Sequence, residues 1–341
     1  QNKDATQNSL PFNIFKNATS ELLAWIRSVS VVRNITSPCR LIEEGSMPDG
    51  LFVVESGSIT VCTKQVDGGK MQLASLDAGS LLGEMSWLEG RPAVASIDAV
   101  AGSRLLQIPM AALESINTSN ALIGHHLYQV IAEKLALQVQ GQNAWIHRVV
   151  SNDKEPLRKV LVLFAELEEK DVGWLARTGK LKRLLPGDVL LKEGDDVPSL
   201  FLLLAGEARI SISENGSWRS VGSSRRGELL GELTMLTPNA NGATANVDTL
   251  TGLDLLVLDK QELMITLNAD PSLAKRFYKG IASMLSQRSR DQLLSRGFAE
   301  SSRMAEEMID DEQLGLDQLS AISSAGLRFD WLCRQFQDKE G

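Results

Sequence analysis

Short apolar segments separated by turn residues fill the stretch between residues 40 and 108. Residues 51–54 and 72–76 are two of these segments, and the series recurs at spacings of roughly 8–12 residues with glycines between. Asp67-Gly68-Gly69 favours a tight hairpin turn, because these residues tolerate a positive φ. The pattern predicts short antiparallel strands that form a sandwich or barrel.

Two later stretches carry an apolar residue at every fourth position. Leu127, Ile131 and Leu135 predict a long helix over residues 119–148, and a second stripe predicts a helix over residues 271–295. The second stripe consists of Leu273, Phe277, Ile281 and Leu285. We expect these helices to carry an interface, in which the stripes meet each other or a second chain. Packing of each stripe on its own domain is an equally weighted alternative.

Shorter helices are expected on either side of the first set of strands. Residues 21–32 have the spacing of a short amphipathic helix. Another helix is expected to begin near Glu155-Pro156, with an apolar side formed by Val160, Leu161, Leu163, Phe164 and Leu167.

The pattern of the first half of the chain restarts in the second half. Gly45, Phe52 and Gly57 recur 149 positions later as Gly194, Phe201 and Gly206. A repeat of this length indicates two copies of one domain and not a solenoid. The predicted organisation is a flexible N-terminus over residues 1–11, a first domain with its long helix over 12–150, a second domain over 151–295, and an acidic helical tail over 296–341.

Each copy also contains the segment Leu-Leu-Gly-Glu followed by a short apolar run and a loop. It begins at Leu81 in the first copy and at Leu229 in the second. The glycine allows the backbone to approach a ligand closely, and the N–H groups of a following helical turn could bind an anion. Glu84 and Glu232 could accept hydrogen bonds from hydroxyl groups.

These segments resemble the phosphate-binding cassette of the cyclic nucleotide-binding domain family, which includes the catabolite activator protein and the regulatory subunits of protein kinase A. The resemblance implies an α+β fold with two jelly-roll-like β-roll domains, each with flanking helices, before the helical C-terminal tail. It also implies that a cyclic nucleotide or related nucleotide is the ligand. The implied ligand-binding residues are Gly83, Glu84, Met85, Ser86, Arg91, Ala93, Val94 and Ser96 in the first copy, and Gly231, Glu232, Leu233, Thr234, Ala243 and Thr244 in the second.

The chain departs from the family pattern at one position in each copy. Ligand-binding members have an arginine there that pairs with the cyclic phosphate, whereas this chain has Ala93 and Ala243. Loss of a charge-assisted contact costs about 1.5–3 kcal/mol, or roughly 10- to 150-fold in affinity. Both cassettes are therefore classed as degenerate, and binding of cyclic AMP and cyclic GMP is expected to be weak or absent.

Three nearby side chains have alternative interpretations. Arg91 lies two residues before Ala93, so a register shift could aim it into the domain, although a loop-tip arginine usually remains in water. Glu84 and Glu232 could cap neighbouring backbone N–H groups and hold the cassette without a ligand.

Composition limits the classes of partner. The net charge of −8 and the excess of acidic residues in the tail make nucleic acid an unexpected partner. Three cysteines in a chain of 341 residues indicate reduced thiols and a cytoplasmic location, with Cys39 and Cys62 in or near the first core. No apolar run approaches the ~20 residues needed to span a bilayer, so no membrane insertion is expected. The chain does not begin with methionine, which indicates either a processed chain or a piece of a longer protein such as a membrane transporter or an enzyme.

Other chemistry is weighed and rejected. The segment between Gly173 and Leu181 has five residues between its glycines and lacks the Ser or Thr of a P-loop. The adjacent His125 and His126 point in different directions on a helix, so no metal site is predicted. No catalytic constellation stands out, and the chain is not expected to be an enzyme.

The function predicted from the sequence is a non-enzymatic regulatory or docking module that controls an attached or associated protein effector. One alternative is a pseudo-sensor scaffold that binds protein and no nucleotide. A weaker alternative is a transcription regulator similar to the catabolite activator protein, because residues 317–336 faintly resemble a helix-turn-helix with Ser324-Ala325-Gly326 as the turn.

Overall fold

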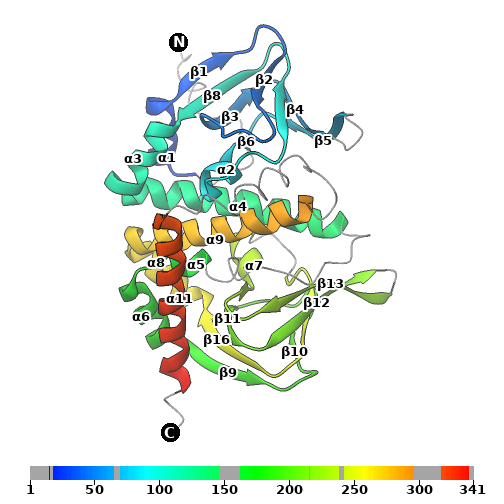
Figure 1. Ribbon diagram of the computed structural model, residues 1–341, viewed down its shortest axis with the longest axis vertical. Coiled ribbons are helices and arrows are strands. Elements are labelled where there is room, and N and C mark those ends of the chain that lie inside the picture. The colour runs from blue at the N-terminus through cyan, green and yellow to red at the C-terminus, as the bar shows by residue number, and fades with distance from the viewer. Residues whose placement is uncertain are drawn as a thin grey trace, which may run out of the picture. The chain divides into compact units, whose positions relative to one another are not determined.

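The computed structural model describes residues 15, 18–64, 70–145, 162–214, 216–237, 242–294 and 316–337. The chain divides into two compact units, which are shown in Figure 1 and are described separately below. Unit 1 comprises residues 1–131 and 290–313, and unit 2 comprises residues 132–289 and 314–341. The domain boundaries that the sequence suggests stay predictions.

Unit 1 contains a β-roll made of two four-stranded sheets. Their strand orders are β1-β8-β3-β6 and β2-β7-β4-β5. The strands are β1 (Val31–Asn34), β2 (Cys39–Ile42), β3 (Gly50–Ser56), β4 (Ser58–Lys64), β5 (Lys70–Asp77), β6 (Leu81–Leu82), β7 (Ser96–Ala99) and β8 (Arg104–Pro109). Every pairing between them is antiparallel, and β4 pairs with β5 as expected for a hairpin, although its turn lies outside the described residues.

Unit 2 repeats this topology strand for strand. Its sheets have the orders β9-β16-β11-β14 and β10-β15-β12-β13. The strands are β9 (Lys180–Leu184), β10 (Val189–Leu191), β11 (Ser199–Ala205), β12 (Glu207–Glu214), β13 (Ser217–Arg225), β14 (Leu229–Leu230), β15 (Asn246–Thr249) and β16 (Leu253–Asp259). Two β-roll domains with flanking helices, the predicted fold class, are therefore confirmed.

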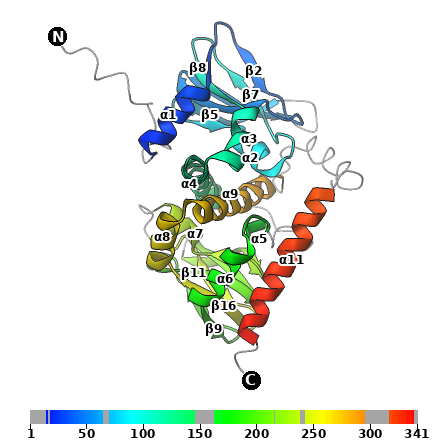
Figure 2. The same cartoon turned by 90° about the vertical axis from the view of Figure 1, so that its left-hand side faces the viewer.

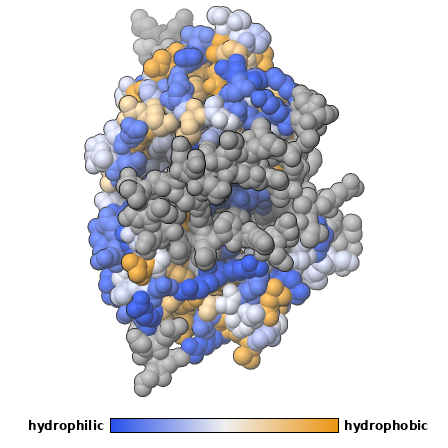
Figure 3. All heavy atoms as spheres, in the orientation of Figure 1, coloured by the Kyte–Doolittle hydropathy of each residue, from blue (hydrophilic) through white to orange (hydrophobic). Residues whose placement is uncertain are grey.

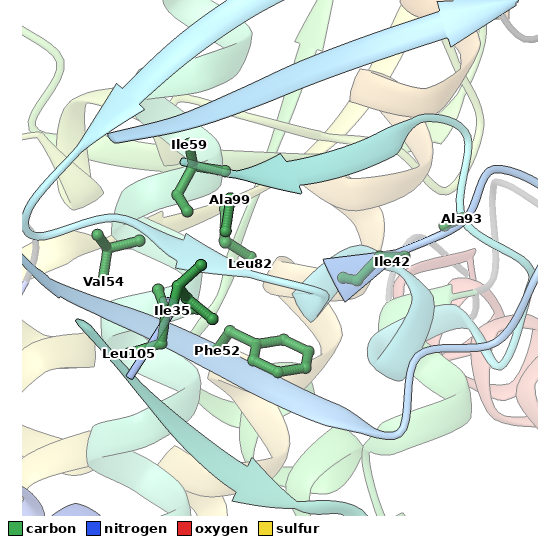
Figure 4. Packing of buried hydrophobic residues seen from close by; sticks show 9 residues of the cluster. All are labelled: Ile35, Ile42, Phe52, Val54, Ile59, Leu82, Ala93, Ala99 and Leu105. Carbon is green, nitrogen blue, oxygen red and sulfur yellow. The ribbon is translucent and has the colours of Figure 1, made fainter. Parts of the chain in front are cut away.

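The core of each roll lies between its two sheets. In the first roll, Phe52 of β3 pairs with Leu82 of β6, and both belong to the buried cluster drawn in Figure 4. In the second roll, Phe201 and Leu230 occupy the same register positions in a matching cluster. Alternating residues of the short strands supply these clusters, as the sequence pattern predicts.

Helices flank both rolls. The helices expected over residues 119–148 and 271–295 are described over residues 121–145 and 271–294, whereas the helix expected over residues 21–32 ends at Val29, because β1 begins at Val31. In the first half of the chain they are α1 (Ser20–Val29), α2 (Glu84–Glu89), α3 (Met110–Ser119) and α4 (Ala121–Trp145). In the second half they are α5 (Val162–Glu166), α6 (Glu169–Thr178), α7 (Glu232–Leu236), α8 (Lys260–Ala269) and α9 (Pro271–Leu294). The expected start of a helix near residue 155 lies outside the described residues.

The apolar stripes of the two long helices are buried within the chain. Each of the seven predicted stripe residues is at most 6% exposed. Within unit 2, Gln138 on α4 donates from Nε2 to Ser289 Oγ on α9 at 2.7 Å, so parts of the two helices lie together there. The alternative in which the helices meet within one chain is supported in this unit, and association with a second chain stays a prediction.

Within the tail, the described residues form one continuous helix, α11 (Leu316–Gln337), and the helix-turn-helix interpretation is wrong. The helix runs straight through residues 324–326, because Ala325 is completely buried and its small neighbours allow close packing. Figure 2 shows α11 along the outside of α5 and α6 in unit 2. Phe329 meets Phe164 of α5 edge to face, with 4.9 Å between ring centroids.

Two further expectations concern single residues and the surface. Cys62 is buried as predicted, but Cys39 is exposed, because it opens the edge strand β2 and not an inner strand. On the face drawn in Figure 3, hydrophobic residues form small separate groups between hydrophilic ones.

In the described part of the chain, no helix combines the length and the apolar character needed to cross a membrane. The predicted flexible N-terminus, residues 1–11, lies outside the described residues.

Candidate functional site

Each cassette begins with a glycine whose conformation only glycine adopts readily. Gly83 and Gly231 both have φ +88° and stand immediately before α2 and α7. A Cβ atom on Gly83 would lie 2.9 Å from the carbonyl oxygen of Gly50, and one on Gly231 would lie 2.8 Å from that of Ser199. The glycine therefore lets the backbone turn sharply against the strand beneath it.

The glycine turn carries a carboxylate into the interior of each roll. Glu84 is 3% exposed and Glu232 is 2% exposed, and each is the first residue of its short helix. Burial of a carboxylate is costly unless charged or hydrogen-bonding groups compensate for the lost water. The two glutamates thus occupy equivalent positions, and they are the most deeply buried charged residues that the sequence singled out.

The arginine positions of the family pattern are filled by buried methyl groups. Ala93 is 9% exposed and belongs to the core cluster of the first roll, where Figure 4 shows it with Ile42 at one end. Ala243 is 6% exposed and belongs to the cluster of the second roll. The backbone is hydrogen-bonded alike at both positions. The carbonyl oxygen of Ala93 accepts from the N–H of Gly45 at 2.8 Å, and that of Ala243 accepts from the N–H of Gly194 at 2.8 Å.

Several other predicted site residues have structural partners. Ser96, 3% exposed, accepts from the backbone N–H of Glu44 at 3.1 Å, and the Glu44 carboxylate accepts from the Thr63 hydroxyl at 3.1 Å. Arg91 is partly buried and not simply in water, and its backbone N–H donates to the carbonyl oxygen of Ser86 at 3.3 Å. Ser86, Val94 and Leu233 are buried, whereas Met85 and Thr244 are partly buried.

Glu232 has a charged partner that the sequence did not reveal. Arg288 of α9 donates from Nη1 to Glu232 Oε1 at 2.7 Å, and the arginine side chain is 29% exposed. The two residues are 56 positions apart in the chain, so no local sequence pattern predicts that they pair. A charge-assisted hydrogen bond of this kind is about twice as strong as a neutral one.

A second cation reaches the same cassette from α8. Lys260 donates from Nζ to Thr234 Oγ1 at 2.6 Å and to the carbonyl oxygen of Val197. Burial lowers the pKa of Lys260 to about 8, and the negative charges of Glu232 and Asp196 oppose that shift. Thr234, a predicted site residue, therefore binds a lysine of its own chain.

The first cassette is held by different contacts. Trp87 of α2 stacks on Tyr128 of α4, with 5.2 Å between the ring centroids and 3° between the planes. At the end of α2, Glu89 Oε2 lies 2.6 Å from Arg290 Nε, and both side chains are 1% exposed. Arg290 also donates from Nη1 to the carbonyl oxygen of Pro92 at 3.0 Å. These contacts anchor the far end of the first cassette.

Each cassette offers groups that suit the binding of a ligand. A Cβ atom on Gly83 would lie 3.6 Å from Ile42, which belongs to the same buried cluster as Ala93. One on Gly231 would lie 3.1 Å from Val197, which belongs to the same buried cluster as Ala243. Within the described residues, no group of three or more His, Cys, Asp or Glu side chains is placed to hold a metal ion. A hydroxyl-bearing ligand would find a carboxylate acceptor, but neither alanine supplies a cation for a phosphate.

Comparison with known proteins gives matches over both rolls. The family model described as "Cyclic nucleotide-binding domain" matches residues 32–120 and 181–270. The cAMP-dependent protein kinase regulatory subunit of Blastocladiella emersonii is 21% identical over 232 residues, which cover 68% of this chain and 51% of that protein. The cGMP-dependent protein kinase egl-4 of Caenorhabditis briggsae is 23% identical over 224 residues, covering 65% of this chain and 26% of that protein.

Among solved structures, the cAMP-bound regulatory domain of Toxoplasma gondii PKA aligns with a TM-score of 0.31 at 15% identity. The alignment covers 82% of this chain and 92% of that one. The chain spans about half the length, or less, of the curated relatives that it matches.

Proposed function

Because this chain belongs to the cyclic nucleotide-binding domain family, we propose that it is a non-enzymatic regulatory module whose two rolls control a protein effector without tight binding of cyclic AMP or cyclic GMP. The effector is either fused to the chain or bound by it. The relatives support the regulatory part, since several of them are regulatory subunits of protein kinases.

One observation carries the ligand part of the proposal. At the positions where ligand-binding members have a phosphate-binding arginine, Ala93 and Ala243 are buried in apolar clusters. A cyclic phosphate placed there would lose its water and gain no arginine at these positions. The missing contact is worth about 1.5–3 kcal/mol, which lowers affinity by roughly 10- to 150-fold.

Calorimetry with cyclic AMP and cyclic GMP tests this proposal directly. The dissociation constant of the unaltered chain for either ligand should not fall below about 1 μM. A submicromolar value would be expected only with a charge-assisted contact to the phosphate. A submicromolar constant for either ligand would refute the proposal. If the unaltered chain binds weakly, as expected, Ala93→Arg should increase the affinity for cyclic AMP, because it restores the guanidinium at the equivalent position.

Ala101→Arg is the matched control for that variant. Ala101 is exposed in the turn between β7 and β8, so the control adds the same charge to the same roll outside its interior. It should leave cyclic nucleotide binding unchanged. If Ala93→Arg folds and still binds nothing, the first roll has lost more than its arginine, and the pseudo-sensor scaffold becomes the better description.

A further inference from the structure

The second cassette is tied down by two cations from two different helices. Arg288 of α9 holds the carboxylate of Glu232 at 2.7 Å, and Lys260 of α8 holds the hydroxyl of Thr234 at 2.6 Å. Glu232 is 2% exposed, so its charge depends on partners within the protein. All four residues belong to unit 2.

The first copy lacks both cations at the corresponding positions. The stripes of α4 and α9 match at an offset of 150 residues, which places Gln138 where α9 has Arg288. The same offset places Met110 where α8 has Lys260. The two copies share strand order and cassette glycine, so the cations are a specific property of the second copy.

The geometry has a direct consequence for ligands. A ligand hydroxyl that donates to Glu232 would compete with a guanidinium that already donates to the same carboxylate. A neutral donor makes the weaker bond, so the exchange is unfavourable. A ligand that bound this carboxylate would also displace Arg288 from it. Unless Arg288 found another acceptor, its charge would be poorly compensated, which is unfavourable.

We propose that Arg288 is a built-in occupant of the second cassette, which holds Glu232 and α7 in place and excludes hydroxyl-bearing nucleotide ligands from this roll. The inference rests on the proposed function, because it assigns the loss of ligand binding in the second roll to a second cause besides Ala243. The burial that lowers the pKa of Lys260 to about 8 supports the picture of a closed cassette.

The first arm of the test uses cyclic AMP as the probe and the full chain as the protein. Ala243→Arg alone should bind weakly, because Arg288 still occupies Glu232. Ala243→Arg combined with Arg288→Gln should bind at least about 10-fold more tightly, the lower end of the range for a charge-assisted hydrogen bond. Equal affinity of the two variants, or binding by neither, would overturn the proposal.

The matched control replaces another arginine of the same roll. Arg225 is 43% exposed and pairs with Glu207 at 3.0 Å, away from the cassette. Ala243→Arg combined with Arg225→Gln should bind cyclic AMP with the affinity of Ala243→Arg alone.

The second arm needs no ligand and remains informative if the binding variants fold poorly. Hydrogen exchange of the α7 amides, residues 232–236, should become faster in Arg288→Gln and also in the charge-neutral pair Arg288→Gln with Glu232→Gln. Unchanged exchange in both would show that Arg288 does not hold the cassette. Tight binding of cyclic AMP to the unaltered chain would refute the proposed function, whereas this exchange experiment would still decide the role of Arg288.

Discussion

Docking of α11 on unit 2 should depend on one buried aromatic side chain, Phe329. Its ring is 1% exposed, meets Phe164 edge to face, and lies 4.9 Å beneath the guanidinium carbon of Arg226. Arg226 also pairs with Asp330 at 2.6 Å. The prediction is that Phe329→Ala detaches α11 from the unit.

The magnitude follows from the burial and from the two ring contacts. A Phe→Ala change in a core costs about 3–5 kcal/mol. The edge-to-face pair accounts for about 0.5–1.5 kcal/mol of this and the cation–π contact for about 0.5–1 kcal/mol. Phe329 shares the buried face of α11 with Leu332 and Phe336, so its loss should weaken the packing of this helix on the unit.

Hydrogen exchange is the suitable assay, because a chain with two units need not unfold in one step. Amides of residues 324–337 should lose most of their protection in Phe329→Ala, while those of β11 and β16 should keep theirs. Leu327→Ala is the control on the same helix, since Leu327 is 65% exposed, and it should change stability by no more than about 0.5 kcal/mol. Equal loss of protection in both variants would refute the reasoning, because burial would then not explain the docking.

Two further predictions concern buried charges. Asp171→Ala should destabilise unit 2 by about 3–5 kcal/mol in urea unfolding, because Asp171 is 3% exposed and accepts from Arg276 at 2.6 and 2.9 Å. The variant would leave Arg276, whose side chain is 14% exposed, with the half-exposed Glu168 at 3.2 Å, and a loss below about 1 kcal/mol would contradict the prediction. Burial, together with the charge of His126, lowers the pKa of His125 to about 4, so protons bind the unfolded chain more tightly than the folded one between about pH 6.5 and 4. Unit 1 should therefore lose stability as the pH falls through this window, by roughly 1–2 kcal/mol at pH 5, and His125→Gln should reduce that dependence; an identical pH profile for the variant would count against it.

The repeat was predictable because it depends on residue types whose local conformational preferences can be recognised in the sequence. Glycines 149 positions apart mark turns that both rolls require, and the four-residue stripes mark helices whose burial needs only periodicity. The same reasoning located the cassette glycines, since both adopt a conformation that other residues resist.

Long-range polar partners could not be predicted in the same way. Glu232 and Arg288 are separated by 56 residues, and nothing in the local sequence of either residue specifies the other. The helix-turn-helix interpretation failed for a related reason. Ser324-Ala325-Gly326 has turn-forming composition, but packing of Ala325 at 0% exposure overrides that local tendency.

The two rolls hold their cassette helices with different contacts. Both must hold a short cassette helix against neighbouring elements. The first uses a parallel aromatic stack between Trp87 and Tyr128, which involves no carboxylate of the site. The second has Met235 at the tryptophan position and uses the site carboxylate Glu232 itself as the anchor for Arg288. Restoring an arginine at position 243 should therefore not suffice for ligand binding in the second roll while Arg288 still pairs with Glu232.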